Sequence, residues 1–208
     1  MNTETNDAAM GLRTALARNA ALVVVDVQKG FGETEFWGPR NNPAADENIA
    51  ALLTAWQETD RPVVFVRHDS VHPESPLHPD RPGNDLKDYV QARRNLGGER
   101  DLFVTKTVNS AFHGTPDLDA WFREAGITQF AVVGIQTNMC VETTARVGGN
   151  LGYRVLFPLD ATYTFDLTGP FGWHQTADEL ARSTAITLHG GDFAEVVTTA
   201  ELLAAAKG

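Results

Sequence analysis

Three residues of this sequence have the types and spacing that nucleophilic hydrolysis requires. Cys140 is the only cysteine of the chain. Asp26 directly follows the apolar run 21–25, and Lys106 directly follows a second run at 102–105. A thiol attacks a carbonyl once its proton is removed, an aspartate can take that proton and return it to a leaving nitrogen, and a lysine can balance the charge. We therefore predict a hydrolase in which an acyl-thioenzyme forms on Cys140.

Each of these residues also has a simpler interpretation. A lone cysteine is often an inert buried residue, Asp26 could only end a strand, and Lys106 could be a solvated surface side chain. A helix is expected over residues 140–150, and its N-terminal amides would stabilise a thiolate. The catalytic interpretation therefore includes a depressed pKa for Cys140.

The surrounding pattern predicts how these residues are positioned. Short apolar runs alternate with segments of helical periodicity, which favours an α/β fold. We expect a doubly wound, mostly parallel sheet of five or six strands with helices on both faces, in one domain over residues 1–208 with an N-terminal arm at 1–19. Ligands of such sheets bind beyond the carboxyl ends of the strands, so Asp26, Lys106 and Cys140 should meet at one edge. The expected strands are 21–25, 62–66, 102–105, 130–134 and 154–157, with an edge strand at 194–197, and the expected helices are 44–60, 117–124, 140–150 and 177–188.

Composition excludes several classes of partner. The 27 acidic and 17 basic residues give a formal charge of −10, and no lysine or arginine cluster occurs. Nucleic acid and anionic membrane surfaces are therefore not expected as partners. The first twenty residues lack the apolar core of a secretory signal, and the longest apolar run, 20–25, is too short to cross a bilayer. A single cysteine also fits a reducing compartment, so we expect a cytoplasmic protein.

Four sequence segments resemble the isochorismatase-like cysteine hydrolase superfamily, which includes nicotinamidases, N-carbamoylsarcosine amidohydrolases and ureido- or biuret-type amidohydrolases. The resemblance implies a three-layer Rossmann-type fold and a triad of Asp26, Lys106 and Cys140. It also implies a cis peptide between Ile135 and Gln136, an oxyanion hole formed by the amides of Gln136 and Cys140, and a homo-oligomer, a dimer or tetramer. The segments are VVVDVQKGF (23–31), VTKTVNSAFHGT (104–115), GIQTNMCVETTARVGGNLGY (134–153) and LDATYTFD (159–166).

One departure from the superfamily concerns metal binding. Its nicotinamidases carry an Asp-x-His and a further His after the second strand, whereas this chain has valine at position 71, two residues after Asp69. The resemblance therefore favours the metal-free amidohydrolase branch, with no cofactor. A site formed by Asp69, His72 and His78 remains the alternative, because these residue types bind zinc-like metals.

Residues near the expected edge could form a substrate pocket, since such pockets combine aromatic walls with a few polar groups. Trp37 lies in an irregular segment after the first strand that resembles a lid. The proline-rich stretch 72–83 is expected to be a loop over the active site or an oligomer contact. Phe36, Tyr163 and Trp173 are further aromatic candidates. The expected substrate-binding residues are Phe31, Trp37, Arg40, His68, Asn109 and Phe112.

The leading functional hypothesis is hydrolysis of a C–N bond, in an amide, ureido or carbamoyl group of a small molecule. A second reading is isochorismatase-type hydrolysis of a vinyl ether, which needs no cysteine. A third is a nicotinamidase-like amidase with an altered metal site, and a fourth is a binding protein without catalysis. The sequence does not identify the substrate.

Overall fold

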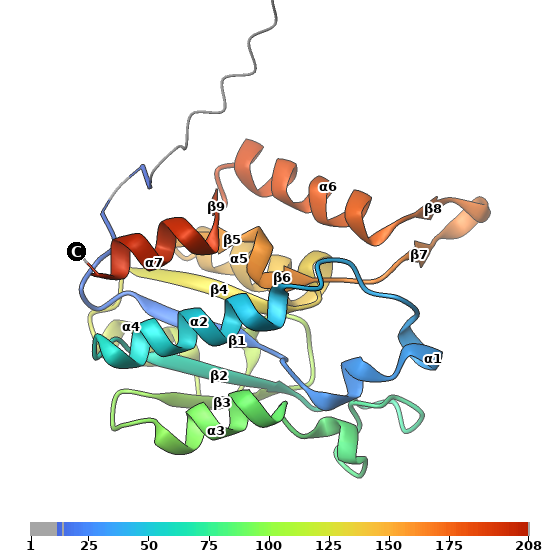
Figure 1. Ribbon diagram of the computed structural model, residues 1–208, viewed down its shortest axis with the longest axis horizontal. Coiled ribbons are helices and arrows are strands. Elements are labelled where there is room, and N and C mark those ends of the chain that lie inside the picture. Colours follow the sequence, from blue (N-terminus) through green and yellow to red (C-terminus); the bar gives the residue numbers. More distant parts are fainter. Residues whose placement is uncertain (1–11, 14, 208) are drawn as a thin grey trace, which may run out of the picture.

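A parallel β-sheet forms the centre of the computed structural model, which describes residues 12–13 and 15–207. Six strands follow the order β3-β2-β1-β4-β5-β9, and a short strand β6 (Thr162–Tyr163) pairs with β4. All these pairings are parallel (Figure 1). The fold class predicted from the sequence is therefore confirmed. The strands are β1 (Ala21–Val25), β2 (Val63–His68), β3 (Leu102–Lys106), β4 (Gln129–Ile135), β5 (Arg154–Pro158) and β9 (Glu195–Val197).

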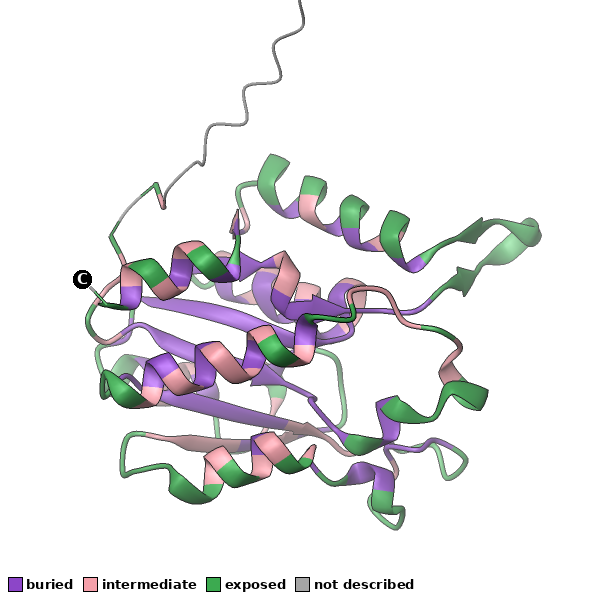
Figure 2. Ribbon diagram, in the orientation of Figure 1, coloured by how far each residue is buried: buried purple, intermediate pink, exposed green. Residues whose placement is uncertain are grey.

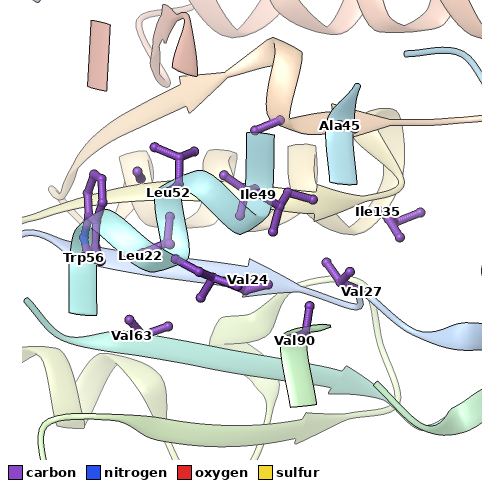
Figure 3. Close-up of a cluster of buried hydrophobic side chains, with 14 of the residues drawn as sticks. Leu22, Val24, Val27, Ala45, Ile49, Leu52, Trp56, Val63, Val90 and Ile135 are labelled. Atoms are coloured by element: carbon purple, nitrogen blue, oxygen red, sulfur yellow. The ribbon is translucent and has the colours of Figure 1, made fainter. Parts of the chain in front are cut away.

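Helices cover both faces of this sheet because successive strand residues point to opposite sides. In β1, Leu22 and Val24 belong to one apolar cluster together with Ile49 and Trp56 of α2 (Figure 3). Val23 belongs to a second cluster on the other face. Burial on both faces explains why these strands are continuous apolar runs (Figure 2). The first cluster includes residues of α2 (Ala45–Glu58), α3 (Asp88–Leu96) and α7 (Thr199–Lys207), and the second includes residues of α4 (Leu118–Glu124), α5 (Glu142–Asn150) and α6 (Ala177–Gly190).

Some elements were not expected from the sequence. They include α1 (Thr34–Trp37), α3, α7, β6 and a small antiparallel hairpin of β7 (Leu167–Thr168) and β8 (His174–Gln175). The hairpin leads into α6 and extends beyond the ends of the strands (Figure 1). Among the described residues, no helix is both long and apolar enough to span a membrane.

The carboxyl edge of the sheet is where the three candidate residues lie. Asp26 follows β1 directly, and Lys106 is the last residue of β3. Cys140 lies in a π-helical turn, η4 (Thr137–Val141), that follows β4 and continues into α5. The expected helix start at residue 140 was therefore wrong. Helical backbone begins three residues earlier, so Cys140 lies within the turn rather than at its first residue.

Gly134 makes a close approach between β4 and β1 possible at this edge. Its φ is +124°, and a Cβ at this position would lie 2.0 Å from the carbonyl oxygen of Val25. We expect Gly134→Ala to lower the free energy of unfolding by about 3 kcal/mol, and Tm by roughly 10 °C. Thermal unfolding checks this, with Gly98→Ala as control because a Cβ there meets nothing within 4 Å. Equal Tm values for the two variants would contradict the close approach.

Candidate active site

Asp26, Lys106 and Cys140 come together at the carboxyl edge of the sheet. Lys106 Nζ lies 2.6 Å from Asp26 Oδ2, and both side chains are fully buried. Ligand-type atoms of Asp26, His68 and Cys140 all lie within 4.8 Å of one another. Asp26 Oδ1 is buried and has no hydrogen-bond partner among the described residues. The cluster thus contains a thiol, a carboxylate oxygen without a partner and a buried ammonium group, as expected of a catalytic triad.

The backbone turn after β1 sets the position of Asp26. Its φ is +53°, in the left-handed region that non-glycine residues rarely adopt and that is enriched at functional sites. Its amide donates to the carbonyl of Val66 in β2 at 3.0 Å, and its carbonyl accepts from the amide of Gln28 at 2.8 Å. These bonds hold the aspartate at the junction between strand and loop.

Charges within the cluster shift the pKa of Lys106 and of His68. Burial alone would lower the pKa of Lys106, but the adjacent Asp26 carboxylate and Cys140 outweigh burial and raise it. Burial and the neighbouring Lys106 ammonium lower the pKa of His68, against the opposing effect of Asp26. Lys106 Nζ also lies 3.2 Å from His68 Nδ1. The site therefore holds a protonated lysine between a carboxylate and a neutral imidazole.

The thiol of Cys140 differs from the sequence expectation. Burial raises its pKa above the ordinary value, and the Asp26 carboxylate raises it further, against the opposing effect of Lys106. The predicted depressed pKa was wrong, because the helix-terminus argument considered neither burial nor the neighbouring carboxylate. The resting thiol is therefore protonated at neutral pH, and reaction at Cys140 requires a group that accepts its proton.

A pocket of about 390 Å³ opens above this cluster. This volume falls within the range of small-molecule sites. Of the six residues expected to bind substrate, Phe31, Trp37, His68 and Asn109 line it, as does Phe36. Five other lining residues were not expected to bind substrate: Leu77, Met139, Phe165, Asp166 and Leu167.

Two expected binding residues lie elsewhere. Arg40 donates to Asp46 Oδ2 at 2.6 Å and lies over the Tyr163 ring, with 4.2 Å from Cζ to the ring centroid. Phe112 packs against Phe122 in the second apolar cluster, with ring centroids 5.9 Å apart. Neither side chain lines the pocket. The Arg40 guanidinium is bound by the Asp46 carboxylate, and the Phe112 ring packs against the second apolar cluster.

The remaining aromatic candidates also lie outside the pocket lining. Tyr163 is fully buried in the first apolar cluster. Trp173 is 69% exposed in the segment that connects β7 and β8.

Arg40 still affects the pocket through its backbone, which forms a β-bridge with Phe165. A signal for Phe165 was present in the sequence, since it lies in the motif of residues 159–166.

Buried amides fix the loops around the pocket. The Gln28 side chain donates to the carbonyls of His68 and Asn84, at 3.0 and 2.8 Å, and accepts from the His68 amide. Asn84 donates to the carbonyl of Leu77 at 2.8 Å. The proline-rich segment 72–83 therefore packs beside the pocket through Leu77. Its role as a lid or as an oligomer contact stays a prediction.

Among the described residues, the alternative metal ligands Asp69, His72 and His78 do not bring their ligand atoms into one cluster. Arg67 binds both carboxylate oxygens of Asp69, at 2.8 and 3.0 Å, and Asn84 donates to Oδ1. His72 is exposed to solvent. The described residues that do bring ligand atoms together are Asp26, His68 and Cys140, where the Lys106 ammonium already contacts the first two.

The peptide bond between Ile135 and Gln136 is cis. The carbonyl of Gln136 accepts hydrogen bonds from the amides of Met139 and Val141, at 3.1 and 3.2 Å, and so anchors the π-helical turn. Gln136 and Cys140 both line the pocket. The turn that carries the thiol is thereby tied to the end of β4.

Comparison with known proteins places this site in a family. A family model described as the isochorismatase domain matches residues 20–201. The chain belongs to the isochorismatase family. Among family relatives, the protein YrdC of Bacillus subtilis is 36% identical over 183 residues, which are 88% of this chain and 94% of YrdC. Streptothricin hydrolase of Streptomyces noursei is 34% identical over 195 residues, which are 91% of this chain and 73% of that enzyme.

The chain is also similar to an enzyme named an amidohydrolase and to a protein of known crystal structure. The ureidoacrylate amidohydrolase RutB of Variovorax paradoxus is 27% identical, over 81% of this chain and 82% of RutB. A crystal structure of an isochorismatase-family protein from Chromobacterium violaceum superposes with a TM-score of 0.83 at 34% identity, covering 93% of this chain and 98% of that one. This isochorismatase-family chain is therefore similar to hydrolases in sequence and shares the family fold.

Proposed function

We propose that this isochorismatase-family hydrolase cleaves a C–N bond, in an amide, ureido or carbamoyl group of a small molecule, through an acyl-thioenzyme at Cys140. One observation carries the proposal. The buried Asp26–Lys106 pair lies beside a protonated thiol on the floor of a pocket, with one carboxylate oxygen unengaged. The similarity to an enzyme named an amidohydrolase supports the choice of bond.

The chemistry begins with one proton transfer. Asp26 takes the thiol proton as Cys140 Sγ bonds to the substrate carbonyl carbon, so the raised thiol pKa is overcome only when a substrate is bound. Lys106 stays protonated beside Asp26, so the pair is neutral before the transfer and carries one positive charge after it, which offsets the negative oxygen of the tetrahedral intermediate. The backbone amides of Gln136 and Cys140 are the proposed donors to the oxygen of the tetrahedral intermediate.

The second half of the reaction returns the proton. Asp26 donates it to the leaving nitrogen as the C–N bond breaks, which leaves an acyl group on Cys140. Water then attacks the thioester, Asp26 accepts a proton from that water, and the thiolate leaves as a thiol after protonation by Asp26. The acid is released as the second product, and the enzyme returns to its starting state.

Ammonia release from a panel of small primary amides, ureides and N-carbamoyl compounds tests this function. We expect the native protein to hydrolyse members of the panel and to lose that activity in proportion to the fraction of Cys140 alkylated by iodoacetamide. Alkylation is specific to one thiol, since Cys140 is the only cysteine. Alkylation at pH 9 increases the reactive thiolate fraction, because the raised pKa keeps the thiol protonated at lower pH.

The vinyl ether reading makes the opposite prediction for the same blocked protein. Protonation of a vinyl ether needs an acid but no thiol. Hydrolysis of a vinyl ether that persists after complete alkylation, with no amide turnover before it, would contradict the proposed function. The pocket residue Cys140 thus separates the two chemistries in a single experiment.

A further inference from the structure

One acidic side chain that lines the pocket, Asp166, has no lysine or arginine beside it in the described lining. Asp26 is paired with Lys106, the thiol of Cys140 is protonated, and burial lowers the pKa of His68 so that its ring is neutral. Among the described lining residues none is a lysine or arginine, and the remaining charged side chain is Asp166. The interior of the pocket is therefore net negative.

The carboxylate of Asp166 is held in place but keeps one oxygen available. Oδ1 accepts a hydrogen bond from the amide of Ala177, the first residue of α6, at 2.8 Å. Oδ2 lies 3.7 Å from His174 Nε2, which is beyond hydrogen-bond distance and makes an ion pair only when that imidazole is protonated. The side chain is 41% exposed. Asp166 directly precedes β7 in the chain and lines the pocket.

Three aromatic rings that line the pocket also favour a bound cation: Phe31, Trp37 and Phe165. The Trp37 ring lies 4.9 Å from that of Phe31 and 5.5 Å from that of Phe165, measured between centroids. Trp37 Nε1 donates to the carbonyl of Gly30 at 3.0 Å, which fixes the indole. The faces of aromatic rings attract cations. A carboxylate beside rigid aromatic rings is the combination that binds an organic cation.

We propose that the substrate hydrolysed at Cys140 carries a positive charge, on an ammonium or similar cationic group remote from the bond that is cut, and that Asp166 selects it. That the bound cation is a substrate rests on the proposed function. The preference of the pocket for positive charge does not depend on it. A carboxylate-bearing molecule would place its charge against Asp166, with no basic lining residue to pair with it.

Thiol reagents of different charge test the preference without any substrate. Three methanethiosulfonates modify Cys140 by the same reaction: the cationic 2-(trimethylammonium)ethyl, the neutral methyl and the anionic 2-sulfonatoethyl reagent. Rates are measured at pH 9, where imidazoles are neutral and the thiolate fraction of Cys140 is larger than at neutral pH. They are measured at low salt and divided by the rates with a free thiol. We expect the cation-to-anion ratio to exceed that of the free thiol by about tenfold.

Two variants assign the preference to Asp166. Asp166→Asn keeps an oxygen for the Ala177 amide and removes the charge, so the ratio should fall to within about threefold of the free thiol. Asp60→Asn removes a charge that pairs with Arg100, three residues before β2 begins and outside the pocket lining, and should leave the ratio unchanged. Equal rates in the native protein, an anionic preference, an equal loss in both variants, or a thiol that no reagent modifies would overturn the proposal.

Matched amides separate this inference from the proposed function. The cationic 4-aminobutanamide, the neutral pentanamide and the anionic glutaramic acid differ in terminal charge at nearly equal length. Ammonia release should be fastest with 4-aminobutanamide. A charge-selective thiol with no hydrolysis of any amide would contradict the proposed function alone, whereas hydrolysis without charge preference would contradict this inference alone.

Discussion

Cys140→Ala is expected to lower kcat/KM for amide hydrolysis by at least about 10⁴-fold, because it removes the nucleophile on which the proposed covalent intermediate forms. The thiol lines the pocket and is nearly buried. Its loss removes the nucleophile while the Asp26–Lys106 pair stays intact. Steady-state kinetics on the best amide of the panel measures the loss.

Stability measurements show whether that loss is chemical. The alanine side chain fits the space of the thiol, so Tm of Cys140→Ala should stay within a few degrees of the native value. Cys140→Ser keeps the shape and replaces the thiol by a weaker nucleophile, and it should also be nearly inactive. Turnover within about tenfold of the native rate in either folded variant would exclude Cys140 as the nucleophile.

Asp26→Asn is expected to separate turnover from thiol reactivity. Turnover should fall about 10³-fold, since the proton acceptor and donor is lost. Alkylation of Cys140 by iodoacetamide at pH 7 should become faster. The Asp26 carboxylate raises the pKa of the Cys140 thiol. Its removal therefore lowers that pKa and increases the thiolate fraction, which speeds alkylation. Slower alkylation in this variant would contradict the assigned electrostatics.

A matched variant controls for the loss of a buried ion pair. Asp26→Asn leaves Lys106 without its partner, which destabilises the fold by roughly 3–5 kcal/mol. Asp46 pairs with Lys87 and Arg40, at 2.8 and 2.6 Å, with 27% of its side chain exposed, and it does not line the pocket. Asp46→Asn should therefore destabilise the protein without changing the reactivity of Cys140 or reducing turnover per folded molecule.

The sheet was predictable from the sequence because strands buried on both faces form continuous apolar runs. Residues 21–25 are an example, and the observed β1 has the same bounds. Two helices were missed for a physical reason. Val90 is the one buried residue of α3, and α7 is rich in alanine, so neither shows a clear apolar periodicity.

The cluster at the sheet edge was predictable because parallel strands end at the same edge, which places Asp26 and Lys106 together. Phe165 and Asp166 were missed as binding residues because their position depends on a β-bridge between Arg40 and Phe165, which joins segments far apart in the sequence. The pKa of Cys140 was mispredicted because burial and a neighbouring carboxylate are properties of the folded site.

Direct detection of an acyl group on Cys140 tests whether the reaction passes through an acyl-thioenzyme. The protein is mixed with 4-nitrophenyl acetate, quenched in acid within milliseconds to seconds, and its peptides are analysed by mass spectrometry. We expect acetylation of Cys140, formed at least as fast as turnover, with a nitrophenolate burst of about one equivalent per chain. Hydrolysis of the ester at the native rate by Cys140→Ala, or turnover with the acetyl group absent from Cys140 at every time point, would contradict it.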